Sequence, residues 1–395
     1  MILRGHKLSL QNTVNKVFSS LKQVWEIVSA SAYSQARKKL KAELFIELNE
    51  IAVEGYYEEY GAEGEVKLWR GHRLLGVDGT YINLPDNEET RREYSVRSNK
   101  YGIEYVQALG SVLYDVRNDI GINAEIGKFQ AEKNFIFENH LKKLKAGDIL
   151  ILDRGYADFS VMVMLILNKI EFVIRFGNNC GLPIREFWKS KETETIIKLK
   201  ATRRSKQYVE ERGLDTEITV RFIKVVLDNG EIEVLATSLL DSKSYPAQEF
   251  KQVYGWRWCQ ETYYNRIKNI FEIERFSGQS VLSIQQDFHG IIFLATLEAI
   301  LIKPSQETLT QTALANNNNN PVKVNRAGSY ISLVDNVVEL LNNKTCSVTD
   351  TLAKLEFLFT ANPSHHREGR KFPRNMRTKP SRKLFCTKYL KRIIS

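Results

Sequence analysis

The sequence has few of the residues that build disulfide or zinc frameworks. It contains 4 cysteines and 6 histidines in 395 residues. The cysteines, at positions 180, 259, 346 and 386, form no Cys-x-x-Cys pair and have no histidine at ligand spacing. These absences exclude a zinc ribbon and a disulfide scaffold, and they fit a protein of the reducing cytoplasm.

Long hydrophobic runs are also missing. The longest apolar run, residues 291–302, includes Glu298. A helix needs about 20 apolar residues to cross a bilayer, so this run predicts a buried helix rather than a membrane span. No signal peptide is evident at the N-terminus. We therefore expect a cytoplasmic protein with no membrane partner.

Charge of one sign is concentrated at the C-terminus. The chain carries 57 Lys and Arg against 47 Asp and Glu, and residues 367–392 hold 11 of those cations with one acid, Glu368. The rest of the chain is therefore neutral. A basic tail of this kind indicates a polyanionic partner such as DNA. The alternative is a tail that only improves solubility.

The length exceeds that of a usual single core, so two or three domains are expected. Residues 1–70 have a helical pattern, with basic residues beside an apolar stripe near 32–48, which suits either a DNA-binding module or an ordinary amphipathic helix. An α/β pattern follows. Its predicted strands lie at 74–80, 105–116, 120–126, 149–153 and 172–176, and its predicted helices at 131–145 and 158–168.

The α/β pattern is interrupted and then resumes. Residues 177–245 read as a β-rich insertion with strands near 217–226 and 231–238, and helices are predicted from 246, at 281–303 and at 330–342. An asparagine run at 316–320 predicts a loop or linker before the last helix.

The most informative stretch is residues 254–268. On a single helix, Tyr254, Arg257, Glu261 and Lys268 fall within roughly 60° of one another. A carboxylate between cations and a phenol suits a metal-bound phosphodiester, because the carboxylate can hold a divalent ion and the neighbouring groups can hold phosphate oxygens. The alternative is a solvated helix face with ordinary i,i+4 ion pairs.

Two aspartates lie within or at the end of buried-looking strands. Asp78 belongs to the first predicted strand, and Asp153 ends the strand at 149–153. A buried carboxylate costs several kcal/mol unless it is paired or bound to a metal. The alternatives are an Asp-Gly turn for Asp78, and for Asp153 an ion pair with Arg154 or a helix cap.

These motifs together resemble those of a known family. Asp78-Gly79-Thr80, Asp153-Arg154-Gly155-Tyr156 and the spacing Tyr254-x2-Arg257-x3-Glu261-x6-Lys268 are similar to the signatures of bacterial DDE transposases of the insertion-sequence-four family. The resemblance covers about residues 1–345. It implies an α/β fold with a ribonuclease H-like catalytic core, interrupted by a β-strand insertion before the catalytic glutamate.

The resemblance also assigns roles. Asp78, Asp153 and Glu261 would be the catalytic metal ligands, holding two Mg²⁺ ions for which Mn²⁺ could substitute. Tyr254, Arg257 and Lys268 would contact DNA phosphates. The partners would be double-stranded DNA, as inverted-repeat ends and target, and a second copy of the chain in a dimeric synapse. The element would be cut out through a DNA hairpin, and its 3′ ends joined to target DNA.

The expected organisation has four parts. They are a helical N-terminal DNA-binding domain (1–70), the catalytic core (71–305) with its insertion (177–245), an Asn-rich linker with a C-terminal helix (306–363), and the basic tail (364–395). Two other functions stay open. One is a ribonuclease H-like metal-dependent nuclease that only hydrolyses DNA, and the other is a non-catalytic DNA-binding derivative of a transposase.

Overall fold

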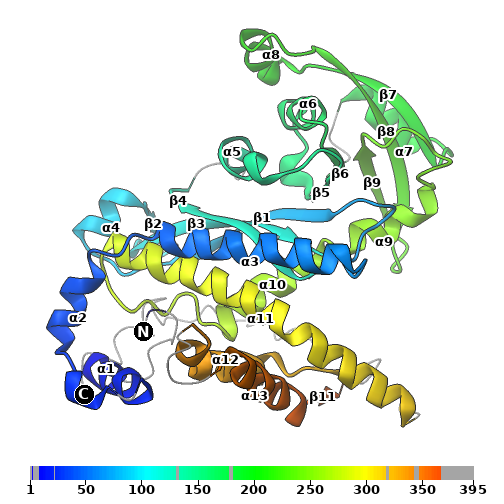
Figure 1. The fold of residues 1–395 in the computed structure, drawn as a ribbon. Coiled ribbons are helices and arrows are strands. Elements are labelled where there is room, and N and C mark those ends of the chain that lie inside the picture. Colours follow the sequence, from blue (N-terminus) through cyan, green and yellow to red (C-terminus); the bar gives the residue numbers. More distant parts are fainter. Residues whose placement is uncertain are drawn as a thin grey trace.

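The structure is a computed structural model, and it describes residue 2 and residues 9–21, 23–129, 133–177, 181–316, 320–341 and 347–365. Most of the predicted basic tail (366–395), part of the asparagine run (317–319) and Cys180, Cys346 and Cys386 lie outside the described residues. One large mixed sheet runs through the molecule, with helices on both of its faces (Figure 1).

The N-terminal region is helical. Its helices are α1 (Leu10–Ser20), α2 (Ala30–Arg37) and α3 (Glu43–Ala62). Serine side chains cap the first two helices, Ser9 at α1 and Ser29 at α2, by accepting hydrogen bonds from backbone amides of the first turn. Helix α3 packs against α11 and strand β4, so the end of this region is part of the central structure.

Five strands form the centre of the sheet in the order β4-β3-β1-β5-β6. They are β1 (Leu74–Asn83), β3 (Glu104–Asp115), β4 (Ile120–Gly127), β5 (Ile149–Leu152) and β6 (Glu171–Phe176). β1, β3 and β4 are antiparallel neighbours, whereas β5 and β6 run parallel to β1. The short strand β2 (Ser95–Ser98) also pairs with β3, after helix α4 (Glu88–Glu93).

The crossover to β5 is less regular than the predicted helix at 131–145. It contains α5 (Lys133–Glu138) and a 3₁₀ turn, His140–Lys143. The helix ends at Asn139, whose backbone leaves the helical region. His140 is then turned into the core, where it hydrogen bonds Ser111 and Asn123. Helix α6 (Phe159–Leu167) connects β5 to β6 as predicted.

Residues 177–245 extend the same sheet. This segment contains α7 (Leu182–Lys189), β7 (Glu194–Lys200), α8 (Arg203–Glu211), β8 (Glu217–Val226) and β9 (Ile232–Thr237). β9 pairs antiparallel with β6, and β8 and β7 follow in order. In the described part of the chain the sheet thus reaches nine strands.

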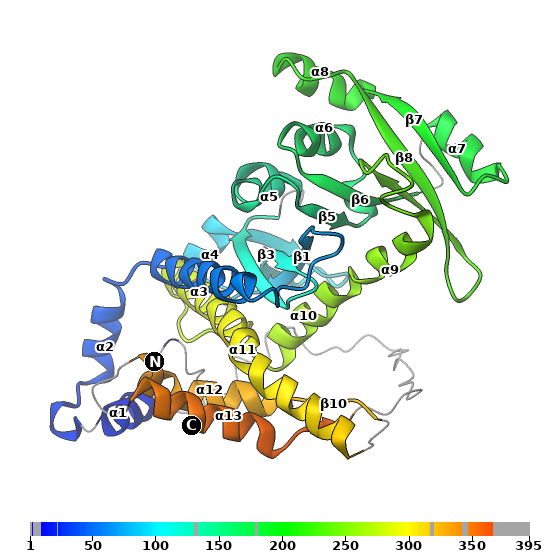
Figure 2. The ribbon, with the colours of Figure 1, turned by 45° about the vertical axis from the view of Figure 1, so that its right-hand side comes forward.

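The helix predicted from 246 is two helices, α9 (Phe250–Gly255) and α10 (Trp258–Asn269). Around the break, Arg257, Cys259 and Gln260 each donate a backbone hydrogen bond to the residue three positions back, so this turn is wound more tightly than an α-helix. Gly255, a weak helix former, precedes it. Figure 2 shows α9 and α10 running from the β7–β9 side of the molecule toward α11.

The C-terminal region holds one helix more than predicted. Helices α12 (Arg326–Leu341) and α13 (Val348–Ala361) pack on each other, α11 (Val281–Ala315) contacts both, and β10 (Val322–Lys323) pairs with β11 (Ser364–His365). In α13 the buried side chains Thr351, Leu355 and Phe359 recur every four residues. This periodicity is the signal by which α13 could have been predicted.

Helix α11 is the long core helix. By length and composition alone it could cross a membrane, but 67% of its apolar window is buried inside the protein. Its acidic residue Glu298 is fully buried, where it accepts from Ser329 and pairs with Arg326. The predicted buried helix at 291–302 is therefore confirmed as the centre of α11.

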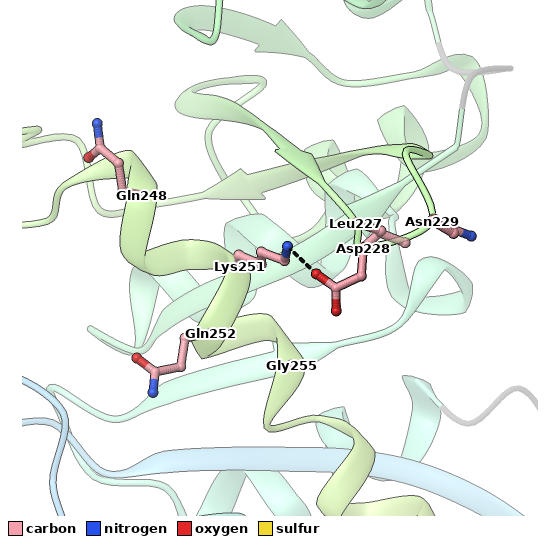
Figure 3. Close-up of a pocket in the computed structure, with 7 residues that line it drawn as sticks. All are labelled: Leu227, Asp228, Asn229, Gln248, Lys251, Gln252 and Gly255. Carbon is pink, nitrogen blue, oxygen red and sulfur yellow. Dashed lines mark hydrogen bonds and ion pairs between the residues drawn. The ribbon is translucent and has the colours of Figure 1, made fainter. Parts of the chain in front are cut away.

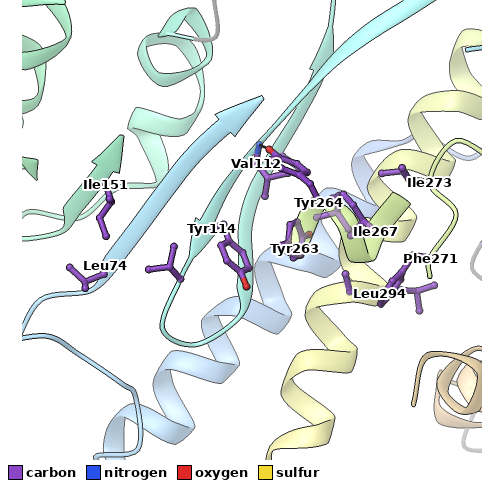
Figure 4. Packing of buried hydrophobic residues seen from close by; sticks show 14 of the residues in the cluster. Leu74, Val112, Tyr114, Ile151, Tyr263, Tyr264, Ile267, Phe271, Ile273 and Leu294 are labelled. Carbon is purple, nitrogen blue, oxygen red and sulfur yellow. Dashed lines mark hydrogen bonds between the residues drawn. The ribbon is translucent and has the colours of Figure 1, made fainter. Parts of the chain in front are cut away.

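Two hydrophobic clusters fill the two faces of the sheet. On β1 and β5, Leu74 and Ile151 face the cluster that contains α10, α11 and α12, whereas Leu75 and Leu150 face the cluster with α3 and α6. This alternation follows from the two-residue period of a strand. Figure 4 shows Tyr263, Tyr264 and Ile267 of α10 in the first cluster. By the same alternation, Asp78 belongs to the face covered by α10.

Candidate active site

Asp78 and Asp153 lie on neighbouring parallel strands. The pairing of β1 with β5 places Leu74 beside Ile149 and Gly76 beside Ile151. Continued two residues further along each chain, this register brings Asp78 level with Asp153, the residue that directly follows β5. Neighbouring strands are about 4.8 Å apart, so the two side chains leave adjacent points of the same face of the sheet.

Helix α10 is held on that face by two buried polar residues. Gln260 Nε2 donates to the carbonyl oxygen of Val112 at 2.8 Å. The Tyr264 hydroxyl donates to the carbonyl oxygen of Asp78 and accepts from Val112 N at 3.0 Å. Figure 4 shows Tyr264 against Val112. Glu261 lies between these two anchors on α10, so its backbone is held over the face of the sheet that carries Asp78.

Gly76 makes this close approach possible. A Cβ atom at this position would lie 2.4 Å from Gln260 Oε1 and 3.3 Å from Val116 Cγ1. The first distance requires a shift, and the atom that must give way is the end of the Gln260 side chain, so a side chain at position 76 would disturb the contact of Gln260 with β3.

Two of the three predicted carboxylates are paired with arginines. Arg175 Nη2 lies 2.8 Å from Asp153 Oδ1, although its angle is not that of a hydrogen bond. Arg257 Nη2 lies 3.0 Å from Glu261 Oε1, the i,i+4 pair expected of an ordinary helix face. The carboxylate side chains keep 39% and 41% of their surface exposed, so both remain open to a ligand.

The structural alternatives for the two aspartates were an Asp-Gly turn, an ion pair with Arg154 and a helix cap, and these are only partly observed. Asp153 pairs with Arg175 of β6, and it begins the 3₁₀ turn Arg154–Tyr156 without a side-chain cap hydrogen bond. Arg154 instead extends over Gly177, where an added Cβ would meet its Cδ at 3.2 Å. Asp78 Oδ1 accepts from Gly79 N at 2.9 Å, but both residues are in the extended strand β1, so no Asp-Gly turn forms.

The three carboxylates are suitable ligands for a divalent ion, but their arrangement in the structure is less suitable. Half-exposed carboxylate oxygens are the ligands that Mg²⁺ prefers. Among the described residues, however, no three Asp, Glu, His or Cys side chains are grouped so that they could hold an ion. In the structure Arg175 and Arg257 pair instead with the carboxylates of Asp153 and Glu261.

The other residues of the predicted stripe separate into two places. Tyr254 and Arg257 are buried, with exposed fractions of 5% and 7%, and neither the Tyr254 hydroxyl nor Arg257 Nε has a hydrogen-bond partner within the described residues. Burial raises the pKa of Tyr254, so the phenol stays protonated. Burial opposes the charge on Arg257, but Tyr254 and the Glu261 carboxylate raise its pKa overall.

Lys268 lies further along β1. Its Nζ donates to the carbonyl oxygen of Tyr81 at 2.7 Å, three residues beyond Asp78. Burial lowers the pKa of this lysine. Helix α10 thus carries Lys268 along β1, whereas Tyr254 lies on α9, which contacts β8.

Sequence reasoning missed four residues of this region, namely Arg175, Glu233, Gln260 and Tyr264. The guanidinium of Arg175 is shared between Asp153 and Glu233 of β9. Its position inside the apolar strand 172–176 was a usable signal, because a charged residue facing a buried surface needs a partner. No local pattern marks Glu233, since β9 pairs with β6 from a distant part of the chain.

The open pocket shown in Figure 3 is separate from these residues. It has a volume of about 660 Å³ and lies between the β8–β9 turn and α9, where Lys251 Nζ pairs with Asp228 Oδ1 at 2.7 Å. None of the predicted site residues lines it.

Comparisons with known proteins agree with the motifs. The family model described as "Transposase DDE domain" matches residues 69–297, which is more than half of the chain. The chain therefore belongs to the DDE transposase domain family, and the family resemblance carried by its motifs is confirmed.

Two relatives extend the comparison. The chain is 22% identical over 294 residues to transposase InsG of insertion sequence element IS4 from Escherichia coli strain K12, covering 74% of this chain and 65% of that protein. A cryo-EM structure of the piggyBac transposase synaptic complex with hairpin DNA matches with a TM-score of 0.35 and 10% identity, over 72% of this chain and 57% of that chain. In each comparison the chain spans less than two thirds of its relative's length.

Proposed function

We propose that this chain is the transposase of an insertion sequence and that Asp78, Asp153 and Glu261 are its catalytic carboxylates. The observation that supports the proposal is the register of β1 and β5. Continued two residues beyond Gly76 and Ile151, it brings Asp78 level with Asp153 on the face of the sheet that α10 covers. Glu261 is on α10, so the three acidic residues, remote in sequence, would meet in one small area of the fold.

The strand order supports a ribonuclease H-like core. Three antiparallel strands followed by two parallel strands, β4-β3-β1-β5-β6, place the first aspartate on β1 and the second at the end of β5. The strands β7–β9 enter the chain between β6 and α9, which is where the family resemblance expects an insertion. We assign residues 71–305 to this core and residues 177–245 to the insertion.

In this proposal the carboxylates hold Mg²⁺, in two ions for which Mn²⁺ can substitute. Bound at the scissile phosphate, such ions activate the attacking oxygen and neutralise charge on the leaving oxygen. Arg257 and the hydroxyl of Tyr254 orient phosphate oxygens beside Asp153, and Lys268 holds the strand further along β1. These groups need only position and neutralise the phosphates, so no base reading is required of them.

The proposed substrates are the double-stranded inverted-repeat ends of the element and a target DNA in the bacterial cytoplasm. A homodimeric synapse would pair the two ends, excision would pass through a DNA hairpin, and each 3′ end would be joined to target DNA. We assign residues 1–70 as a DNA-binding region, residues 306–363 as the C-terminal linker and helices, and residues 364–395 as an arm for DNA.

The variant Glu261→Gln tests the site. It removes the charge but keeps the size of the side chain, so we expect DNA-end cleavage to fall by at least about 10³-fold, while binding of end DNA stays within about threefold. The measurement is cleavage of labelled inverted-repeat DNA, with binding followed by gel shift. Glu210→Gln, which removes an exposed i,i+4 partner of Lys206 on α8, is the control and should cleave normally.

Normal cleavage by Glu261→Gln would refute the assignment of the catalytic glutamate. Strand transfer with precut ends separates the two enzyme classes, since a purely hydrolytic nuclease would release product without joining it to target DNA. Intact cleavage of ends without any joining would support the nuclease.

A further inference from the structure

A row of alternating charges crosses the sheet beside the candidate active site. β5 and β6 pair with Leu152 beside Ile174, so Asp153 stands next to Arg175. In the antiparallel pair of β6 and β9, Arg175 is opposite Leu235, which makes Glu233 its diagonal neighbour on the same face. Arg175 of the core strand β6 therefore contacts an acid of the core, Asp153, and an acid of the insertion, Glu233.

That guanidinium is shared between two carboxylates. Arg175 Nη2 lies 2.8 Å from Asp153 Oδ1, and Arg175 Nη1 donates to Glu233 Oε1 at 2.6 Å. The contact with Glu233 is aligned as a hydrogen bond, whereas the contact with Asp153 is not. Glu233 is also the more buried acid, with 18% of its side chain exposed against 39% for Asp153.

A cation that binds Asp153 must compete with Arg175 for the same oxygen. Once displaced, a partly buried guanidinium needs another anionic partner, because an unpaired charge there costs free energy. Glu233 provides that partner without requiring Arg175 to leave its strand. Of the two contacts of Arg175, the one with Glu233 already has the geometry of a hydrogen bond.

We propose that Glu233 is a positioning residue that retains Arg175 and so leaves Asp153 available to a divalent ion. This inference rests on the proposed function, since it takes Asp153 as a metal ligand. It gives the insertion strand β9 a role in metal binding, although β9 itself supplies no ligand. The competing explanation is a purely structural ion pair that fastens β9 to β6.

The test is Mn²⁺ binding by the full-length protein without DNA, measured by the electron paramagnetic resonance signal of the free ion. We expect Glu233→Gln to weaken Mn²⁺ binding about tenfold, because Arg175 is then left with Asp153 as its carboxylate partner. Glu233→Asp keeps the charge and should stay within about threefold of the unmodified protein. Glu217→Gln, which removes an acid of the same insertion sheet that pairs with Lys198 and Lys200, is the matched control and should change nothing.

A double-mutant cycle separates positioning from simple loss of charge. In an Arg175→Met background Glu233 has no guanidinium to retain, so adding Glu233→Gln should change the Mn²⁺ affinity by less than about twofold. An equal loss of affinity in both backgrounds, or none in either, overturns the inference. Thermal melting of each variant checks that the sheet is intact. If Glu233→Gln alone does not fold, Arg175→Met is compared with the unmodified protein: it removes the competing guanidinium and should bind Mn²⁺ at least as tightly, and weaker binding overturns the inference.

Asp153→Asn distinguishes the two proposals. Mn²⁺ binding that survives Asp153→Asn unchanged, or is undetectable in the unmodified protein, contradicts the metal site itself. Binding that is lost in Asp153→Asn but untouched by Glu233→Gln contradicts only the role of Glu233.

Discussion

The burial and the hydrogen bonds of His140 determine its tautomer and its protonation state. The ring is fully buried, with Nε2 3.0 Å from Ser111 Oγ and Nδ1 3.0 Å from Asn123 Nδ2. Because the Asn123 amide nitrogen can only donate, Nδ1 must accept and the proton sits on Nε2. Burial lowers the pKa of His140 to about 3, so the imidazole is neutral at physiological pH. It is a structural residue, not an acid–base catalyst.

This histidine should make stability depend on pH. Its pKa is lower in the folded protein than the ordinary value of about 6.5, so the unfolded chain binds the extra proton and stability is lost as pH falls below about 6.5. From pH 6.5 to pH 5 we expect a loss of about 2 kcal/mol from this residue alone. In urea denaturation, His140→Gln should be less stable than the unmodified protein at pH 7, and the gap should narrow toward pH 5. The other buried histidine, His289, remains in both proteins and cancels, so parallel pH curves would contradict the prediction.

At the level of single residues, the sequence identified the candidate carboxylates but not their partners. Asp78, Asp153 and Glu261 stood in local motifs that can be recognised without a fold. The pairing of Asp153 with Arg175 rather than with the adjacent Arg154 depends on which strand lies beside β5. Glu233 required the further knowledge that β9 joins β6. Such contacts are set by long-range strand pairing, which no local pattern encodes.

Among the elements, the contact of β1 with α10 is the one on which the site depends. Gln260 has 1% of its surface exposed, and the nitrogen and oxygen of its side-chain amide lie against Val112 and Gly76. Tyr264 fixes the next turn of the helix to Asp78 and Val112. Within the described residues Glu261 pairs with Arg257, so its position over β1 depends on these two neighbours.

The substitution Gly76→Ala tests this contact. Its Cβ would lie 2.4 Å from Gln260 Oε1, so α10 must move away from β1 or Gln260 must give up its bond. Overpacking of this kind costs about 1–3 kcal/mol, and we expect DNA cleavage to fall with stability. Gly55→Ala in α3 is the matched control, since its Cβ meets nothing within 4 Å, and it should be neutral or stabilising by up to about 1 kcal/mol. Equal melting temperatures for both variants would show that α10 is not held this closely.

The helix predictions failed where tertiary contacts override local preference. The predicted helix from 246 divides at Trp256 and Arg257. There the guanidinium carbon of Arg257 lies 5.7 Å from the ring centroid of Tyr254 and 5.0 Å from that of Trp258. The predicted helix at 131–145 breaks so that His140 can enter the core. Both segments keep the residue types of a helix, so their periodicity alone could not reveal the breaks.

Across the whole molecule, a buried ionic network connects the core to the C-terminal helices. Asp119 accepts from Arg266 of α10 at 2.5 and 3.0 Å and from Arg326 of α12 at 2.7 Å, while Arg326 also pairs with Glu298 of α11. Burial would raise the pKa of Asp119, but the two arginines lower it strongly, so the carboxylate is ionised. The helix of the candidate glutamate is therefore braced by α12, far from it in sequence.

The net charge of the chain is also a property of the whole molecule, because it is concentrated in one segment. Residues 1–366 are neutral overall, and the excess of 10 positive charges belongs to residues 367–392, outside the described residues. The strand β11 ends at His365 and pairs with β10, so a deletion that begins at 366 leaves the described fold whole. The tail can therefore be tested apart from the site.

Deleting residues 366–395 should weaken non-specific DNA binding and reduce its dependence on salt. Each phosphate contact that is lost lowers the slope of log affinity against log salt by about 0.9, so the loss of four contacts would reduce it by nearly 4. The measurement is fluorescence anisotropy with a random-sequence duplex over a range of salt concentrations. Deleting 381–395 removes 5 of the 11 tail cations and should give about half of the change. Cleavage of inverted-repeat ends should survive both deletions, because the candidate carboxylates lie in the described fold. A slope equal to that of the full chain would mean that the tail serves solubility rather than DNA binding.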